Sequence, residues 1–441
     1  MSKKGYRSFK GGIHPPYYKG LASARPIAVA PVPPEVTIPL SQHIGAPSSP
    51  LVSAGDRVTV GQLIGSAEAF VSAPVHSSVA GTVKSVEDIV SFAGVTVKAV
   101  VVAADRQQPR FEPGKTRTVD GLAPAEIVTI AKDAGLVGMG GAAFPTHVKL
   151  TPPRDKPVDA VLINACECEP FLTCDHRLML ERSAYLVEGL KLLVRAVGAR
   201  HGIVGVEANK MDAVEKMKAA VANEANLSVE VLDVKYPEGS EKQLIAAATG
   251  RKVPPGKLPS EVGCLVQNVG TAVALYEAAS TGKPLFERVL TVTGPGIKYP
   301  SNFLVRIGTP VSVLIETAGG FTGGPTRLIM GGPMTGWAQA DAGAVVVKGT
   351  SGILALTPEL VDVRDEHACV RCGKCVDVCP MYLLPNFIVD AVQKGEWEKA
   401  EMWGAIDCFE CGCCSYACPA YIPHVEYVRK AKAEIGVLKR R

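Results

Sequence analysis

Apolar and polar positions change their period several times along the chain, and each change predicts a different kind of structure. From about Ile38 to Val102, short apolar stretches separated by turn residues are typical of β-strands. From Pro124 to Ala134, apolar residues recur at three- and four-residue spacing, which predicts a helix. Further on, the pattern predicts strands at 159–164, 203–206 and 229–234 and helices at 183–197 and 211–225. Strands that alternate with helices predict an α/β domain over about residues 120–275.

Beyond this domain the sequence returns to short apolar stretches. RVLTVTG, PVSVLIE, LIMGG and AVVVKG, between about 285 and 356, read as strands of a small β-rich domain. The remainder is rich in cysteine, and the first 30 or so residues lack a regular pattern. A chain of 441 residues exceeds one compact core. We therefore expect a multidomain α/β and β protein with boundaries near 1–118, 119–280, 281–358 and 359–441.

The N-terminal strands carry a recognisable unit. Gly-Asp-x-Val-x-x-Gly-Gln at 55–62, Ala-Pro at 73–74 and Gly-Thr-Val at 81–83 resemble the biotinyl/lipoyl-type barrel-sandwich. Carrier domains of that type present an attachment lysine at a hairpin tip. Here the tip reads Glu68-Ala-Phe-Val-Ser-Ala-Pro and contains no lysine. This unit is therefore predicted to serve in packing or docking.

Composition narrows the class of protein. The net charge of +4 is small and aromatic residues make up only 6%, so we expect no nucleic-acid partner. No stretch of about 18 uncharged apolar residues occurs, so we expect no direct membrane span. Because the N-terminal residues lack an apolar run, we also expect no secretory signal. Thirteen cysteines in a chain expected to stay in a reducing compartment favour metal binding over disulfides.

Two copies of one cysteine motif occupy the C-terminal quarter. Each reads C-x2-C-x2-C-x3-C-P, the pattern of ferredoxins with two [4Fe–4S] clusters, in which the fourth cysteine ligates the other cluster. The motif predicts one cluster on Cys369, Cys372, Cys375 and Cys418. It predicts the second on Cys408, Cys411, Cys414 and Cys379.

Zinc is the alternative metal for clustered cysteines. A zinc site needs four thiolates and has no use for a third cysteine at the same spacing or for the Cys-Pro ending. Cys413 beside Cys414 is a surplus thiol and is predicted not to be a ligand. The 28 residues between Cys379 and Cys408 look helical, which predicts a ferredoxin-like domain elaborated with helices.

A glycine-rich loop and a polar segment lie in the predicted α/β domain. Gly138, Gly140 and Ala143 form a G-x-G-x-x-A, a weak fingerprint because a helix precedes it, although its N–H groups could approach a phosphate. NACECEPFLTCDHR, beginning at Asn164, follows an apolar strand directly. Ligands of α/β sheets lie at the carboxyl ends of strands, so this polar group, with Glu167 and Glu169, predicts a nucleotide site.

These segments resemble a family. GMGGAAFPTHVK at 138–149 is similar to the flavin loop of the NADH-binding subunit of respiratory complex I, and NACECEP, YPEGSEKQL at 236–244 and QNV at 267–269 resemble its other motifs. Together with the GGIHPP start, the lipoyl-like unit and the two-cluster end, the chain resembles the C subunit of the Rnf complex. That complex is a membrane-bound, ion-translocating ferredoxin:NAD+ oxidoreductase, and the resemblance covers essentially all 441 residues.

The resemblance implies FMN held non-covalently, with NAD(H) stacked over it. Matched by position, the residues expected near the FMN phosphate are Gly138, Gly140, Gly141 and Lys149. Asn164 and Asn268 would meet the flavin, with Glu167 in the same segment. Phe144 would stack on nicotinamide or adenine, and Glu169 and Glu241 would contact NADH. The stretch 285–350 matches the family's SLBB β-grasp domain.

The chain departs from the complex I pattern at two places. Met139 replaces the loop arginine, so the phosphate charge must be met otherwise, for which Lys149 is one candidate. Cys166 and Cys168 replace an aspartate and a glycine. With Cys174 they have no standard metal-ligand spacing, so no third metal site is predicted.

In this interpretation FMN mediates between two-electron hydride transfer and one-electron clusters, and no protein nucleophile is required. The expected partners are the other subunits of an Rnf-type complex, including a ferredoxin-like cluster subunit. The expected location is peripheral, on the cytoplasmic face of the cell membrane. A soluble NADH-dependent flavin/iron–sulfur cobalamin reductase has the same architecture and is the alternative enzyme. A pure relay, with clusters and no nucleotide site, is the alternative from another class.

Overall fold

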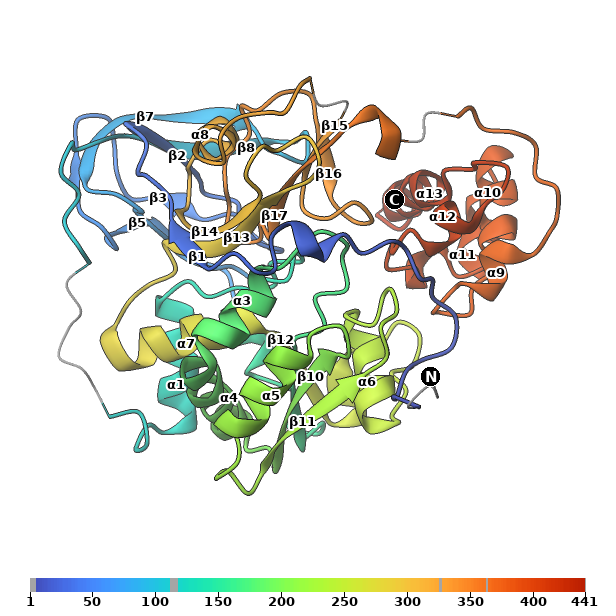
Figure 1. Ribbon diagram of the computed structural model, residues 1–441, viewed down its shortest axis with the longest axis horizontal. Helices are drawn as coiled ribbons and strands as arrows, with labels where there is room; N and C mark the ends of the chain where they lie inside the picture. Colours follow the sequence, from blue (N-terminus) through green and yellow to red (C-terminus); the bar gives the residue numbers. More distant parts are fainter. Residues whose placement is uncertain (1–4, 112–117, 325–326, 362–363, 441) are drawn as a thin grey trace.

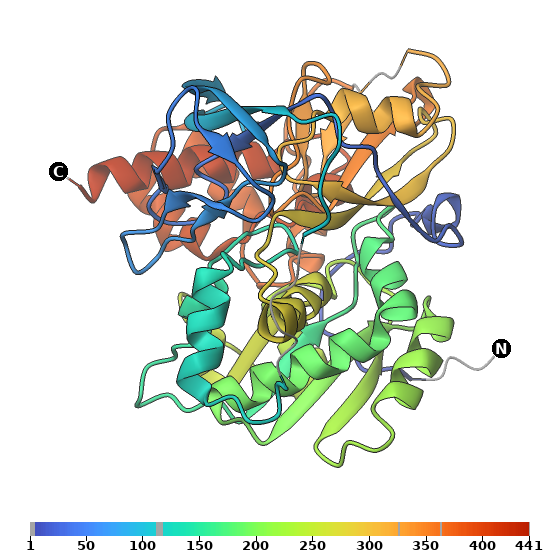
Figure 2. The same cartoon turned by 90° about the vertical axis from the view of Figure 1, so that its left-hand side faces the viewer.

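The computed structural model describes residues 5–111, 118–324, 327–361 and 364–440. Four units follow one another along the chain and are seen together in Figure 1. A β unit and a second sheet domain lie side by side, an α/β domain lies below them in that view, and a helical domain lies at one end. The turned view of Figure 2 separates the two β units from the α/β domain.

The α/β domain contains a parallel sheet in the order β11-β10-β9-β12. Its strands are β9 (Ala160–Asn164), β10 (His201–Glu207), β11 (Leu227–Leu232) and β12 (Cys264–Asn268). The chain runs from β9 outward to β10 and β11 and then returns to the other side of β9 as β12. This reversal makes the carboxyl ends of β9 and β12 the switch point of the sheet, where ligands of such folds bind.

Helices cover both faces of this sheet. They are α1 (Pro124–Asp133), α2 (Thr146–Lys149), α3 (Cys174–Glu181), α4 (Ser183–Val197), α5 (Met211–Ala220), α6 (Glu241–Thr249) and α7 (Val269–Thr281), with the short η2 (Pro259–Val262). Alternate residues of β9 separate two cores, because successive strand side chains point to opposite faces. Val161 packs in the core that contains Leu190 of α4, and Leu162 packs with Leu244 of α6. The predicted helix 211–225 ends earlier, at Ala220.

The N-terminal β unit is a sandwich of two antiparallel sheets. One holds β2 (Glu35–Pro39), β8 (Thr96–Ala104), β7 (Gly81–Val90) and β4 (Arg57–Val58), and the other holds β3 (Ser49–Pro50), β5 (Leu63–Ser66) and β6 (Val75–His76). The lysine-free tip between β5 and β6 lies on the α/β domain, where the Phe70 carbonyl is 2.9 Å from His147 Nε2. Nearby, the Ile44 N–H donates to the Ala143 carbonyl over 3.3 Å.

The third unit is a six-stranded sheet, in the order β1-β14-β13-β17-β15-β16, with one helix. Its elements are β1 (Ile27–Val29), β13 (Glu287–Thr293), β14 (Ser301–Arg306), α8 (Val311–Thr317), β15 (Arg327–Met330), β16 (Trp337–Gln339), β17 (Gly352–Leu356) and η3 (Pro358–Leu360).

Two strand predictions in this unit are wrong. PVSVLIE forms α8, whose Val311, Leu314 and Ile315 fill the core at three- and four-residue spacing. AVVVKG is irregular apart from one bridge between Pro310 and Val345. In both segments the β-branched residues contribute to burial without forming a strand. Tertiary packing therefore overrides their strand propensity.

The first residues lie across the other units as a strap, which we define as residues 5–30. Arg7 and Ile13 form bridges with Leu232 and Tyr236 of the α/β domain. The Gly12 N–H donates to the Val378 carbonyl of the helical domain over 2.8 Å. The strap then forms η1 (Lys19–Leu21) and adds β1 to the six-stranded sheet. Figure 1 shows it in dark blue between the sheet domains and the α/β domain.

The C-terminal unit consists of short helices. These are α9 (Lys374–Asp377), α10 (Pro385–Gln393), α11 (Trp397–Met402), η4 (Ala405–Asp407), α12 (Cys413–Ala417) and α13 (His424–Leu438). Ile388, Val428 and Ile435 form its core, which confirms the helical interpretation of residues 380–407. Within the described ranges, no helix has the length and apolar character needed to cross a membrane.

Candidate functional site

The carboxyl ends of β9 and β12 hold the two asparagines expected at the flavin. Asn164 and Asn268 are register partners in the parallel ladder, so both lie at the same edge of the sheet. The glycine-rich loop lies beside them, and a Cβ added at Gly140 would be 3.4 Å from Asn268 Nδ2. Residues separated by more than 100 positions in sequence therefore meet at the switch point of the fold.

The glycine-rich loop is a tight turn with an open outer face. Its base is closed by the Gly138 N–H, which donates to the Phe144 carbonyl, and by the Ala143 N–H, which donates to the Gly138 carbonyl. Gly140 and Gly141 are exposed, and a Cβ at Gly141 would meet nothing within 4 Å. Gly141 has φ +115, a conformation that side chains rarely adopt. Such a loop leaves room for a phosphate against the backbone.

Lys149 and Glu241 are brought together, although the sequence assigned them to different parts of the ligand. Lys149 Nζ lies 2.6 Å from Glu241 Oε1 and 3.1 Å from the Val266 carbonyl. Both side chains are partly exposed. The ammonium of Lys149 is thus already paired in the protein, which limits how much phosphate charge it can offset.

The amide of Asn268 is engaged on both sides. Its Nδ2 donates to Asp175 Oδ2 over 2.7 Å, and its Oδ1 accepts from the Gly270 N–H as the N-cap of α7. Burial, with the nearby Glu167 carboxylate as a further cause, raises the pKa of Asp175, and the bond from Asn268 opposes this rise. Asn164 Nδ2 donates to the Gly239 carbonyl over 2.6 Å, so Asn164 fixes the 236–241 loop, whereas Asn268 joins the starts of α3 and α7.

The two glutamates of the NACECEP segment have different surroundings. Glu167 accepts from the Asp175 N–H over 2.7 Å at the first turn of α3, so it stabilises a helix N-terminus. Glu169 accepts from the Met334 N–H, over 3.1 Å, and from the Thr335 hydroxyl in the SLBB-like sheet domain. Burial raises the pKa of Glu169, and these two bonds oppose the rise. Contact of Glu169 with NADH therefore stays a prediction.

Lys19 of the strap is a residue that the sequence did not single out. Its Nζ donates to the carbonyls of Glu167, Glu169 and Leu172, over 2.7, 3.0 and 2.7 Å. Burial lowers the pKa of Lys19. No local pattern could have identified it, because its three acceptors lie about 150 residues away in the chain.

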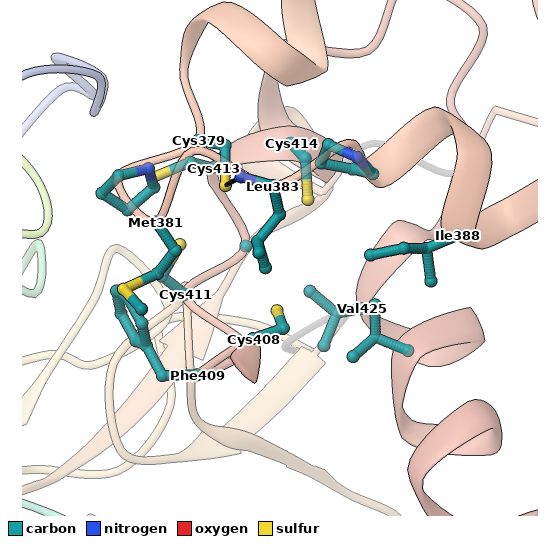
Figure 3. A pocket seen from close by; sticks show the side chains of 14 residues that line it. Cys379, Met381, Leu383, Ile388, Cys408, Phe409, Cys411, Cys413, Cys414 and Val425 are labelled. Carbon is teal, nitrogen blue, oxygen red and sulfur yellow. Dashed lines mark hydrogen bonds between the residues drawn. The ribbon is translucent and has the colours of Figure 1, made fainter. Parts of the chain in front are cut away.

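Four of the predicted cluster ligands line one cavity, which we call the inner cavity. Its thiols are Cys379, Cys408, Cys411 and Cys414, with the surplus Cys413 in the same wall. Figure 3 shows these side chains with Leu383, Ile388 and Val425 beside them. One member comes from the first motif and three from the second. This is the grouping that the cross-pairing of two-cluster ferredoxins requires.

The other four predicted ligands line a second cavity, the outer cavity. Cys369, Cys372, Cys375 and Cys418 surround it, with Asn386 and His424 in its wall. Cys369 and Cys372 are exposed, whereas Cys375 is buried. In the described ranges, no three His, Cys, Asp or Glu side chains are placed to hold a single metal ion. The donor sets fit two four-thiolate groups, and their role as ligands stays a prediction.

The inner cavity abuts the nucleotide side of the molecule. Tyr236 Oη donates to the Cys411 carbonyl over 2.8 Å, and the Tyr236 carbonyl accepts from the Ile13 N–H. Cys168, from the polar segment after β9, packs in the same buried cluster as Tyr236 and Cys411. Gln243 of α6 also donates to the Pro380 carbonyl, over 2.9 Å. One tyrosine thus joins the 236–241 loop to the wall of the inner cavity.

The surplus thiols outside the two motifs are buried. Burial raises the pKa of Cys166, Cys168 and Cys174. Cys413 is fully buried, and its thiol is 3.9 Å from the Tyr236 carbonyl. These positions fit small apolar side chains packed at domain junctions.

Family models match the four units in order. They are the RnfC barrel sandwich hybrid domain over residues 7–107, the Nuo51 FMN-binding domain over 131–277, the SLBB domain over 289–338 and a 4Fe-4S dicluster domain over 361–433. The fold and the matched domains thus define a flavin-binding iron–sulfur protein of the complex I NADH-subunit type. The predicted fold class, FMN domain and dicluster domain are confirmed.

Full-length relatives then give the family. The chain is 46% identical to the C subunit of the "Na(+)-translocating ferredoxin:NAD(+) oxidoreductase complex" of Acetobacterium woodii, over 98% of both chains. It is 44% identical to the C subunit of the "Proton-translocating ferredoxin:NAD(+) oxidoreductase complex" of Clostridium ljungdahlii, over 97% of this chain and 94% of that one. The chain belongs to this family, the C subunits of ion-translocating ferredoxin:NAD(+) oxidoreductase complexes. This confirms the resemblance stated from the sequence.

A solved structure shares the fold at lower identity. A chain of an NAD+-reducing [NiFe]-hydrogenase in its air-oxidized state is 20% identical, with a TM-score of 0.50 over 72% of this chain and 62% of that chain. At this identity the likeness concerns the fold alone.

Proposed function

We propose that this chain is the NAD(H)-reacting electron-transfer subunit of an ion-translocating ferredoxin:NAD+ oxidoreductase complex, with FMN and two [4Fe–4S] clusters as its cofactors. Full-length membership in the family supports the activity and the partners, which are the other subunits of such a complex. One observation carries the electron path: Tyr236 links the loop beside Asn164 and Glu241 to the inner cavity. When bound, FMN supplies the exchange between two-electron hydride chemistry and one-electron transfer.

The burial and exposure of the predicted ligands support an order for the two clusters along this path. The inner cavity lies against the α/β domain through Tyr236 and Gln243, whereas the outer cavity has exposed Cys369 and Cys372. We place the inner cluster next to the flavin and the outer cluster at the surface. The outer face then meets the partner subunit, a ferredoxin-like cluster protein. We also propose that the chain is held on the cytoplasmic face of the membrane by its partner subunits.

The residues of the nucleotide site have assignable roles in this proposal. The open glycine loop, Gly138 to Gly141, receives the FMN phosphate, Asn164 holds the 236–241 loop, and Asn268 holds the start of α3 beside the flavin. Phe144 is partly exposed at the base of the loop, where its ring can stack on NADH. Glu241 lies beside Lys149 at the start of α6. These residues position the cofactors, and none is required as a nucleophile or base.

The test is anaerobic reconstitution of the full chain with iron, sulfide and FMN, followed by addition of NADH. We expect bleaching of the flavin absorbance and EPR signals of reduced clusters. Reduction of two clusters by dithionite with no flavin binding would contradict the proposal and leave a pure relay. A parallel assay measures NADH-dependent reduction of cob(III)alamin. The relatives carry names of ferredoxin:NAD(+) oxidoreductase subunits, so we expect cob(III)alamin reduction to be much slower than cluster reduction.

A further inference from the structure

The glycine-rich loop is supported from beneath by the SLBB domain. Arg288 on β13 donates from Nη1 to the Met139 carbonyl over 3.1 Å and to the Lys348 carbonyl over 2.7 Å. The neighbouring Gly349 lies so close that an added Cβ would be 3.2 Å from the Gly141 carbonyl. The glycine-rich loop thus has solvent on its outer face and the SLBB domain against its inner face.

Arg288 carries a buried positive charge with little compensation. The residue is 3% exposed, and in the described part of the chain its guanidinium makes no ion pair and bonds to carbonyl oxygens and the Cys174 sulfur. Cys174 and Asp175 are the groups able to carry a negative charge that act on Arg288. Burial raises the pKa of both, so neither is a full counter-charge at neutral pH. An unpaired buried charge is costly, which favours an anion nearby.

The lysine side chains near the loop already have other partners. Lys149 is paired with Glu241 at 2.6 Å. Lys348 Nζ donates to the carbonyls of Pro74 and Gly135, and burial lowers its pKa to about 7, so it is only partly charged at neutral pH. Met139 provides no charge, and its buried side chain would touch a Cβ placed at Gly270. A guanidinium, by contrast, remains protonated in proteins.

We propose that Arg288 of the SLBB domain supplies the positive charge that balances the FMN phosphate at the glycine-rich loop. It is a positioning residue: it holds the Met139 carbonyl and acts on the phosphate through the loop backbone, without touching the ligand. The charge that the complex I loop carries on its own arginine is thus delivered here from another domain. This inference rests on the proposed FMN site.

Comparison of FMN with riboflavin isolates the effect on the phosphate. The two flavins differ only in the phosphate group, so an electrostatic role of Arg288 changes the affinity for FMN and spares riboflavin. A merely structural role changes both affinities in step. Dissociation constants of both are measured for the cluster-reconstituted full chain by quenching of flavin fluorescence, in the wild type and in Arg288→Gln and Arg288→Lys.

We expect Arg288→Gln to raise the Kd for FMN about tenfold or more, and the Kd for riboflavin less than about twofold. Arg288→Lys keeps the positive charge but places it farther from the loop, because the lysine side chain is shorter. We therefore expect the Kd for FMN to rise about threefold and the Kd for riboflavin to stay unchanged. Arg306→Gln is the matched control. Arg306 lies on the neighbouring strand β14, with its own carboxylate at Glu287, and its loss should leave the ratio of the two constants unchanged.

An equal loss of affinity for FMN and riboflavin, or no loss of affinity for either, would overturn the inference. If Arg288→Gln does not fold, as judged by circular dichroism and cluster content, Arg288→Lys decides by the same ratio. A wild type that binds neither flavin would instead contradict the proposed function, so the two failures are distinguishable.

Discussion

The inner and outer cavities are built from the same motif and have the same local backbone. Gly373 and Gly412, which precede α9 and α12, have φ of 79 and 80, and Tyr382 and Tyr421, three residues after the last cysteine of each motif, have φ of 57 and 55. Their surroundings differ. The inner cavity is walled by Cys379, 8% exposed, and Cys411, 7% exposed, whereas Cys369 and Cys372 of the outer cavity are exposed.

Position in the fold, rather than the ligand motif, therefore distinguishes the surroundings of the two predicted clusters. Lys374 and Cys413 occupy the same place in the two copies, directly after the glycine. Lys374 is exposed, whereas Cys413 is fully buried against Tyr236. A charged side chain suits a face that meets solvent or a partner. A small thiol suits a face pressed against the α/β domain.

The largest expected effect comes from removal of one ligand from each cavity. We expect Cys411→Ala and Cys372→Ala each to retain about four of eight irons. With NADH, Cys372→Ala should still show one reduced cluster, because the inner path is intact, whereas Cys411→Ala should show none. Iron content and EPR after NADH addition give the result. Reduction of the outer cluster by NADH in Cys411→Ala would break the proposed order.

Accessibility to small reagents should also separate the two clusters. Since two outer thiols are exposed, we expect ferricyanide with a chelator to remove the first half of the iron about tenfold faster than the second half. In Cys372→Ala only the slow phase should remain. The release of iron is followed by its coloured chelate. A single phase in the wild type would mean that the two environments do not differ in solution.

A network of ion pairs lies at the inner side. Glu410 accepts from Arg429 Nε over 2.8 Å and from Lys432 Nζ over 2.7 Å, and Lys432 also bonds the Cys408 carbonyl. Burial pushes the pKa of Glu410 up, but the bonds to Arg429 and Lys432 outweigh it and leave the pKa lowered. The stabilisation is therefore present above about pH 4.5 and is lost as the pH falls through the lower folded value.

We expect Glu410→Gln to destabilise the folded chain by about 1 kcal/mol at pH 7 and by the same amount at pH 6, because both values lie above the range in which this carboxyl titrates. The measurement is urea unfolding of the cluster-loaded chain at both pH values. Glu366→Gln is the matched control, because Glu366 is an exposed partner of the Tyr427 hydroxyl at the outer side. An equal loss in both variants would remove the distinction between the two sides.

The last prediction concerns one hydroxyl, whose effect on stability should be as small as that of Glu410→Gln. Tyr236→Phe removes the bond to the Cys411 carbonyl and should cost about 1 kcal/mol, because that carbonyl stays buried without its donor. We expect slower electron transfer from flavin to the inner cluster, measured by stopped-flow absorbance. Tyr427→Phe, which loses an exposed bond to Glu366, should leave this rate unchanged. A Tyr236→Phe rate equal to the wild type would show that the hydroxyl does not set the junction.

Much of the molecule could be predicted from the sequence. The eight cysteines, the α/β pattern and the flavin-type segments are local signals. Each can be recognised from residue spacing or hydrophobic periodicity within a short stretch of sequence. The strand errors at PVSVLIE and AVVVKG arose because β-branched segments are buried in helices and loops as well as in strands. The β-branched pattern of these two segments is the same as that of true strands, and only tertiary packing distinguishes a helix or loop from a strand.

Sequence motifs identify the chemistry: which residues can hold clusters, which loop can hold a phosphate, and which family the chain resembles. The folded arrangement alone shows which cavity is inner, that Lys149 is already paired with Glu241, and that Lys19 and Arg288 support the nucleotide site from other units. This follows from sequence separation. Motifs record chemistry over a few residues, whereas these contacts join residues that are between 92 and 149 positions apart.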